Sequence, residues 1–164
     1  MNNADYAPLH IDGVGTFQAY SGNGRYRNKT GFTHIAINGP LPTGRYYIVD
    51  RPTRGAKGTL YNIAHDSWSW PTSTPVIKGE WFALYSDDCR LDDKTFINEV
   101  ERGSFRLHPP GPAGISLGCI TLRHRSDFLF IRQALLATTC GKLTNGLKCY
   151  GEIDKSCRRQ EVNL

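Results

Sequence analysis

The fold of this chain is decided by the stretch Phe105–Leu122, which reads FRLHPPGPAGISLGCITL. Its apolar ends, FRLH at Phe105–His108 and CITL at Cys119–Leu122, predict two short strands. The loop between them contains too much proline and glycine to form a helix or a strand. If the two strands are neighbours in a sheet, this loop brings His108 back beside Cys119.

A histidine next to a cysteine is the arrangement that thiol chemistry needs. The thiolate is the reactive form of cysteine, and a free cysteine is mostly protonated at neutral pH. The imidazole of His108 can take the proton of Cys119 and hold the thiolate as an ion pair. The spacing alone is not specific, because a lone cysteine is often a small buried hydrophobic residue.

The residues just before Cys119 extend the candidate site. Gly118 lacks a side chain, so the backbone can approach a substrate closely. The backbone N–H groups of Leu117, Gly118 and Cys119 could converge on a developing oxyanion. Ser116 could form a hydrogen bond within the loop or assist His108. Three residues near the motif in sequence are candidate substrate contacts: Tyr85, Arg106 and Arg123.

Further strands are predicted on both sides of this stretch. A helix is predicted at Asp92–Arg102, which begins with acidic residues, and another at Ser126–Thr139, with Ser126 as its cap. Many strands and two short helices predict an α+β chain that is mostly β, built as a β-sandwich or an open barrel. We see no repeat and no linker, so residues 1–164 are expected to form one domain. The other predicted strands are Gly13–Ser21, Arg45–Asp50, Leu60–Ala64, Glu80–Tyr85 and Leu147–Ile153, and Asp66–Pro75 is a predicted loop.

The composition limits the classes of partner. Of the 164 residues, 39% are apolar and 21% charged, as in a globular domain, and the net charge is +5. That charge would suit an anionic partner, but the basic residues do not form a stripe and no nucleic-acid-binding motif accompanies them, so no nucleic acid is expected. No apolar run is long enough to insert into a membrane, and the first residues lack the pattern of a signal peptide.

The chain has five cysteines, so at least one thiol has no partner within the chain. With Cys119 set aside, the other four allow three pairings. Three of these four lie in the last quarter of the chain, which is compatible with a disulfide-bonded tail in an oxidising compartment, and free thiols are the alternative. These four are Cys89, Cys140, Cys149 and Cys157. The histidines other than His108 lack metal-ligand spacing, so no metal is expected.

Two motifs resemble those of YkuD-type L,D-transpeptidases. In that family a histidine precedes Ser/Thr-His-Gly-Cys, and here His108 precedes Ser116-Leu117-Gly118-Cys119. An upstream Ser-x-Gly, followed by Thr-Pro-x-Gly and an aromatic strand, is matched by Tyr20-Ser21-Gly22 and Leu41–Ile48. Longer stretches are similar to the L,D-transpeptidase-like effectors of type VI secretion systems: YSGNG, GPLPTGRYYIVDR, WFALYSDD and FRLHPPGPAGISLGCITL.

Three positions depart from the transpeptidase pattern. Leu117 replaces a histidine, Pro109 replaces the glycine that follows the catalytic histidine, and Thr121 stands where many transpeptidases have an arginine. All three agree with the effector subgroup. They weigh against a housekeeping cross-linking role and leave the nucleophile unchanged.

The resemblance implies a YkuD-like fold and a cysteine-dependent L,D-carboxypeptidase or L,D-transpeptidase. Cys119 would attack the carbonyl of the third residue of a peptidoglycan stem tetrapeptide, and D-alanine would leave. Water would then complete hydrolysis, or a free D-amino acid would complete an exchange. No cofactor is needed. The alternatives are a cross-linking L,D-transpeptidase and a non-catalytic cell-wall-binding module, in which Cys119 would be buried far from His108.

The resemblance also implies an antibacterial effector made in the cytoplasm without a signal peptide and delivered into the periplasm of target bacteria. Its expected partners are the stem peptides, a cognate immunity protein and a delivery component of the type VI secretion system.

Overall fold

A computed structural model describes residues 2–51, 77–88, 90–139, 141–155 and 160–163. The predicted strand Leu60–Ala64 and the predicted loop Asp66–Pro75 lie outside these residues. The strands of the main sheet are β1 (Ala7–Ile11), β2 (Gly15–Tyr20), β3 (Gly44–Asp50), β4 (Phe82–Ser86), β7 (Arg106–His108), β8 (Ile120–Leu122), β9 (Gly141–Lys142), β10 (Lys148–Lys155) and β11 (Gln160–Asn163).

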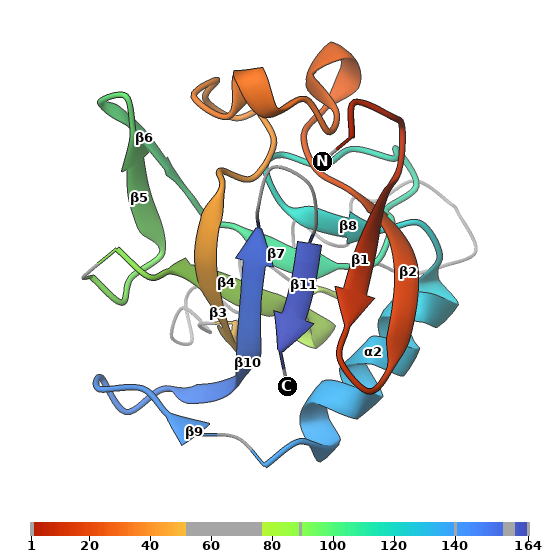
Figure 1. Ribbon diagram of the computed structural model, residues 1–164, viewed down its shortest axis with the longest axis vertical. Coiled ribbons are helices and arrows are strands. Elements are labelled where there is room, and N and C mark those ends of the chain that lie inside the picture. Colours follow the sequence, from red (N-terminus) through yellow and green to blue (C-terminus); the bar gives the residue numbers. More distant parts are fainter. Residues whose placement is uncertain (1, 52–76, 89, 140, 156–159, 164) are drawn as a thin grey trace.

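The main sheet has the order β11-β1-β2-β8-β7-β4-β3-β10-β9. Strand β11 also pairs with β10, so the sheet curls back on itself in the manner of a barrel (Figure 1). Short 3₁₀ turns at Gly24–Tyr26, Thr30–Phe32 and Lys78–Glu80 lie in the connections. The α+β, mostly β class predicted from the sequence is confirmed.

One of the two predicted helices is present as helix α2 (Arg125–Ala137). Its buried face carries Phe128, Ile131 and Leu135, which are fully buried, as the helical spacing predicts. Leu136, by contrast, is 42% exposed. The helix begins before Ser126, and the capping position belongs to His124.

The helix predicted at Asp92–Arg102 is wrong. These residues form a hairpin of β5 (Lys94–Ile97) and β6 (Val100–Gly103). The two turn residues, Asn98 and Glu99, both have positive φ, as a two-residue hairpin turn of the favoured twist requires. The alternation of buried and exposed side chains also fits strands. Thr95 and Arg102 face each other and are buried, whereas Phe96 is 61% exposed.

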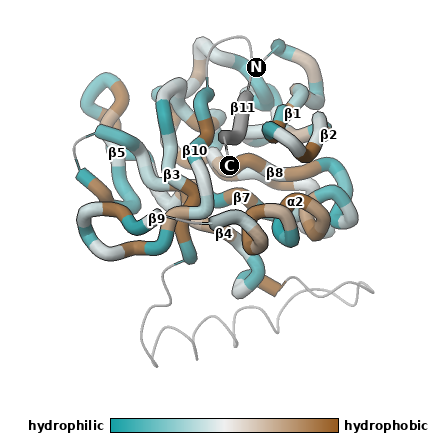
Figure 2. Tube along the Cα trace, turned by 60° about the horizontal axis from the view of Figure 1, so that its bottom comes forward, coloured by the Kyte–Doolittle hydropathy of each residue, from teal (hydrophilic) through white to brown (hydrophobic). Residues whose placement is uncertain are grey.

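The main core lies on one face of the sheet. Leu107, Ile120 and Leu122 pack there with the buried side chains of α2, and Figure 2 shows hydrophobic segments gathered along β7, β8 and α2. Burial of each such side chain stabilises the fold by roughly 1.5–3 kcal/mol. Successive side chains of a strand point to opposite faces, so His108 and Thr121 project from the other face. The core therefore fixes the two strands that present the candidate site.

Candidate active site

Strands β7 and β8 are parallel neighbours, the condition on which the sequence argument depended. Leu107 pairs with Ile120, and His108 pairs with Thr121. Continuing this register places Cys119, which precedes β8, beside Arg106. Cys119 and Thr121 are two residues apart, so their side chains share a face of the strand. His108 and Cys119 therefore lie on the same face of adjacent strands.

The imidazole of His108 is fixed on both of its nitrogens. Nδ1 lies 2.7 Å from the carbonyl oxygen of Pro109, and Nε2 lies 3.1 Å from Oγ1 of Thr121. A carbonyl can only accept a hydrogen bond, so Nδ1 carries the proton and Nε2 accepts one from the Thr121 hydroxyl. The ring also stacks on Trp81, with 4.4 Å between ring centroids. His108 thus has the tautomer in which Nε2 is the basic nitrogen.

Burial keeps this imidazole neutral. Only 6% of His108 is exposed. Because burial disfavours the charged form, the pKa of His108 falls to about 4, and the hydrogen bond to Pro109 offsets only part of this effect. At neutral pH the ring is therefore a free base.

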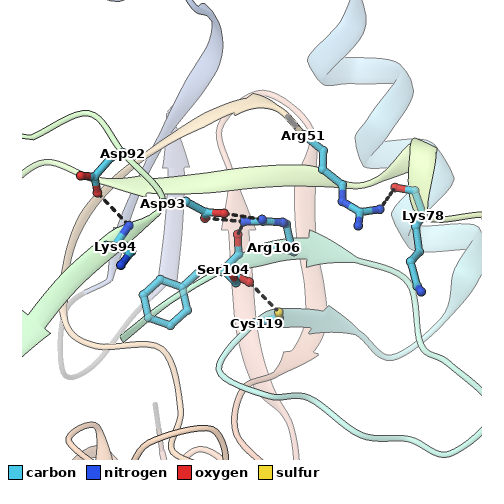
Figure 3. Close-up of polar contacts among 9 residues, drawn as sticks. Arg51, Lys78, Asp92, Asp93, Lys94, Ser104, Arg106 and Cys119 are labelled. Carbon is cyan, nitrogen blue, oxygen red and sulfur yellow. Dashed lines mark hydrogen bonds and ion pairs between the residues drawn. The ribbon is translucent and has the colours of Figure 1, made fainter. Parts of the chain in front are cut away.

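The thiol of Cys119 is also neutral at rest. It is 8% exposed and donates a long hydrogen bond, 3.8 Å, to the carbonyl of Ser104 (Figure 3). Burial raises the pKa of Cys119 to about 11, although the backbone N–H and the charge of Arg106 both lower it. The thiolate–imidazolium ion pair expected from the sequence is therefore not the resting state of these groups.

These observations bear on the non-catalytic alternative in two ways. The burial of Cys119 agrees with it, because an inert cysteine is usually a buried one. The placement of His108 on the same face of the adjacent strand does not, since that reading expects the two residues to lie far apart.

The loop before Cys119 is held in a tight turn. Ser116 donates a hydrogen bond of 2.8 Å to the carbonyl of Cys119, which is the within-loop role considered for it. Gly118 has a φ of +86°, a conformation that residues with side chains rarely adopt. Leu117 is half exposed. The turn therefore depends on a glycine immediately before the sulfur.

The two sequence motifs meet at this turn. The Ser21 hydroxyl donates to the carbonyl of Gly118 at 3.4 Å and accepts from the backbone N–H of Leu41 at 2.7 Å. Buried Asn28 in turn holds the backbone N–H of Ser21. Arg27 donates to the carbonyl of Gly114, farther along the loop. The upstream Tyr20-Ser21-Gly22 motif thus supports the loop that carries Cys119.

Of the three candidate substrate contacts, only Arg106 lies beside Cys119. Its guanidinium is engaged in a two-pronged ion pair with Asp93, with distances of 2.6 and 2.5 Å (Figure 3). Tyr85 is buried in a small cluster with Val49 and Ala83. Arg123 lies against the β1–β2 side, where it contacts Gln18 and the ring of Tyr6.

Several site residues were missed by sequence reasoning. Thr121 was noted only as a departure from a family pattern, although its position two residues after Cys119 gave a signal that it shares the face of the sulfur. Trp81 stacks on His108, and Tyr20 lies opposite Thr121 on the neighbouring strand. Both placements depend on the pairing of strands, which no local sequence pattern reveals.

Within the described residues, no group of three or more His, Cys, Asp or Glu side chains is arranged to hold a metal ion. The helices in that same part of the chain include none long and apolar enough to cross a membrane. Cys89, Cys140 and Cys157 lie outside the described residues, so the disulfide-bonded tail and the free thiols both stay hypotheses.

In a comparison with protein families, a family model described as the Tlde1 domain matches residues 15–145. This match spans the upstream Tyr20-Ser21-Gly22 motif, the hairpin, and the His108 and Cys119 strands. Comparison with curated proteins and with solved structures gave no significant match.

Proposed function

The chain belongs to the Tlde1 domain family of type VI secretion effectors, and from this premise we propose that it is an antibacterial enzyme that attacks peptidoglycan through Cys119. The observation that carries the proposal is the placement of His108 and Cys119 on one face of adjacent parallel strands. The hydrogen bond from Nδ1 to Pro109 supports it, because it leaves Nε2 as the base. The proposed substrate is the stem tetrapeptide, cleaved before its terminal D-alanine.

The proposed reaction proceeds in two steps. In the first, the Thr121 hydroxyl turns its hydrogen away from Nε2 of His108, which frees the lone pair of that nitrogen. Sγ of Cys119 then attacks the carbonyl carbon of the third residue while its proton passes to Nε2. The backbone N–H groups at Gly118 and Cys119 would stabilise the oxyanion. When the tetrahedral intermediate collapses, the C–N bond breaks and the proton on Nε2 passes to the amine of the leaving D-alanine, which leaves a thioester.

In the second step an acceptor attacks the thioester carbon. His108 takes a proton from the acceptor and returns it to the departing sulfur. Water as the acceptor gives a tripeptide, so the net reaction is L,D-carboxypeptidase hydrolysis. The amine of a free D-amino acid gives a new tetrapeptide, so the net reaction is exchange.

The resting protonation states fit this order of events. A neutral thiol and a neutral imidazole carry no charge that burial would penalise. Charge would appear only as the sulfur attacks, when the oxyanion and the imidazolium form together. We therefore propose general-base catalysis, with proton transfer coupled to the attack.

We propose that hydrolysis and exchange outweigh cross-linking. A cross-linking enzyme must admit a second stem peptide to the thioester. Here the loop before Cys119 is short, contains three prolines, and is tied down at Gly114, Ser116 and Gly118. Water and a free D-amino acid are small acceptors that need no second large groove.

Mass spectrometry of tetrapeptide muropeptides incubated with the purified protein tests this proposal. Tripeptides should form with wild-type protein, and exchanged tetrapeptides should appear when a D-amino acid is added. Cys119→Ala should form neither while keeping the circular-dichroism spectrum of the folded protein. Turnover by folded Cys119→Ala would refute the cysteine mechanism. A major yield of dimers joined through their third residues would favour the cross-linking alternative, and an inert wild-type protein would favour the non-catalytic module.

A further inference from the structure

The base of the candidate site lies against the face of an aromatic ring. Strands β4 and β7 are antiparallel neighbours, with Phe82 opposite Leu107. Continuing this register places Trp81 opposite His108, so both side chains project from the face that carries Cys119. The indole and the imidazole are stacked, with 4.4 Å between ring centroids and 20° between ring planes. The pairing of the strands therefore sets this stack.

Packing alone does not account for an indole at this position. Nε1 of Trp81 is buried, and none of the described residues accepts a hydrogen bond from it. A buried donor without an acceptor costs free energy. A phenylalanine ring would fill much of the same space without burying a donor. The face of the indole, rather than its N–H group, is therefore the feature that needs a physical reason.

We propose that Trp81 is a positioning residue for His108, and that its indole stabilises the imidazolium that forms when the base takes the proton of Cys119. This inference rests on the proposed function, since that function assigns His108 as the base. The indole acts through the imidazole and contributes no atom to the bonds that form or break.

The electrostatics of an indole suit this role. The face of an aromatic ring carries negative potential, and tryptophan attracts a cation more strongly than phenylalanine or tyrosine does. The attraction grows where water is excluded, and His108 is only 6% exposed. A neutral imidazole gains little from this potential. The contact is therefore stronger in the transition state than at rest, which is the difference that accelerates a chemical step.

The charged groups near the stack oppose the imidazolium. The guanidinium of Arg106 lowers the pKa of His108. The guanidinium of Arg51 lies over the indole, 5.6 Å from its centroid, and competes for the same ring. The two polar contacts of the imidazole, with the Pro109 carbonyl and the Thr121 hydroxyl, are uncharged. The indole thus offsets part of the repulsion that the imidazolium meets.

Fluorinated tryptophan tests this role with little change of shape. Fluorine withdraws electrons from the indole and weakens the potential of its face. The chain has three tryptophans, so Trp68→Phe and Trp70→Phe leave Trp81 as the single position for monofluoro- and tetrafluorotryptophan. In steady-state kinetics of D-alanine release, kcat should fall with added fluorine, to about a tenth of the unlabelled double variant, with KM unchanged. A kcat that does not depend on fluorine would overturn the proposal.

Alkylation of Cys119 by iodoacetamide at pH 7 gives a readout that needs no peptide substrate. Because this pH lies far below the Cys119 pKa of about 11, the thiol reacts by passing its proton to the imidazole. Tetrafluorotryptophan at Trp81 should slow this alkylation about tenfold. His108→Asn is the matched control, in which fluorine should have no effect, since the base is absent. A fluorine effect that persists in His108→Asn would show that the indole does not act through the imidazole.

The two measurements separate this inference from the proposed function. If the unlabelled protein does not turn over tetrapeptides, the proposed function fails, and the alkylation series still decides the role of Trp81. Should the double variant not fold, Trp81→Phe in the otherwise unchanged chain carries the test. It should slow alkylation of Cys119 about threefold, and this slowing should vanish in the His108→Asn background. Equal slowing in both backgrounds would contradict the proposal.

Discussion

The guanidinium of Arg102 lies directly behind Gly118: a Cβ atom on residue 118 would be only 2.9 Å from Nη2 of Arg102. The same guanidinium donates to the backbone carbonyls of Thr33 and Gly39. Arg102 belongs to the hairpin, so this buried cation joins three segments at the turn before Cys119. The hairpin is therefore part of the support for the candidate nucleophile.

Gly118→Ala should damage both stability and activity. The alanine would be strained by the positive φ and would collide with Arg102 and with the ring of Phe105, at a combined cost of about 2–4 kcal/mol. Gly114→Ala is the matched control, because Gly114 also has a positive φ but has open space around it. It should cost only about 1 kcal/mol, measured as the free energy of unfolding in urea. Equal losses in the two variants would show that the contact with Arg102 is unimportant.

The strands around the site could be predicted from the sequence, whereas the hairpin could not. FRLH and CITL combine apolar alternation with flanking proline and glycine. A short-range sequence pattern is therefore sufficient to predict these two strands. At Asp92–Arg102 the acidic residues resemble the first turn of a helix. The true signal was an Asn98-Glu99 turn, in which only Asn98 is a residue that commonly adopts positive φ.

The candidate site was predictable to the extent that it is local. His108 and Cys119 stood out because both lie in one motif with a loop between them. Because side chains alternate along a strand, the sequence could have placed Thr121 on the same face as Cys119. Tyr20 could not be placed in this way, because its contact with Thr121 depends on the pairing of β2 with β8, strands far apart in the sequence. Long-range pairing is set by the packing of the whole sheet.

Asp93 should control the stability of the hairpin and the reactivity of the thiol. Asp93→Asn removes the charge that pairs with the mostly buried Arg106, and we expect a loss of about 1–3 kcal/mol in the free energy of unfolding. The negative charge of Asp93 also raises the pKa of Cys119, so its removal should lower that pKa and speed alkylation by iodoacetamide at pH 8. Glu101→Gln breaks the exposed pair with Lys94 on the same hairpin and should cost less than about 0.5 kcal/mol. Slower alkylation in Asp93→Asn would contradict this account.

His108 should make the protein sensitive to acid. Its pKa is about 4 in the folded chain against 6.5 for the free side chain, so between these values the unfolded chain binds more protons. Stability should therefore fall as the pH drops from about 6.5 to 4, by about 3 kcal/mol from this residue. His108→Asn should remove that part of the loss, measured by urea unfolding at pH 7 and pH 4.5. An unchanged pH dependence in His108→Asn would show that the histidine is not held neutral by burial.

The effector assignment predicts that harm depends on the compartment. Peptidoglycan stem peptides, the proposed substrate, lie in the periplasm, so the protein should be harmless when expressed in the cytoplasm and should stop growth when fused to an export signal. Exported Cys119→Ala should be harmless, because it cannot form the thioester. A cognate immunity protein should restore growth, and we expect it to cover the surface around Cys119 and to block alkylation of that thiol. Plate counts and muropeptide analysis of the same cultures give the readout. Toxicity of exported Cys119→Ala would show that the damage does not pass through the thiol, and harmless exported wild-type protein with normal muropeptides would count against the effector role.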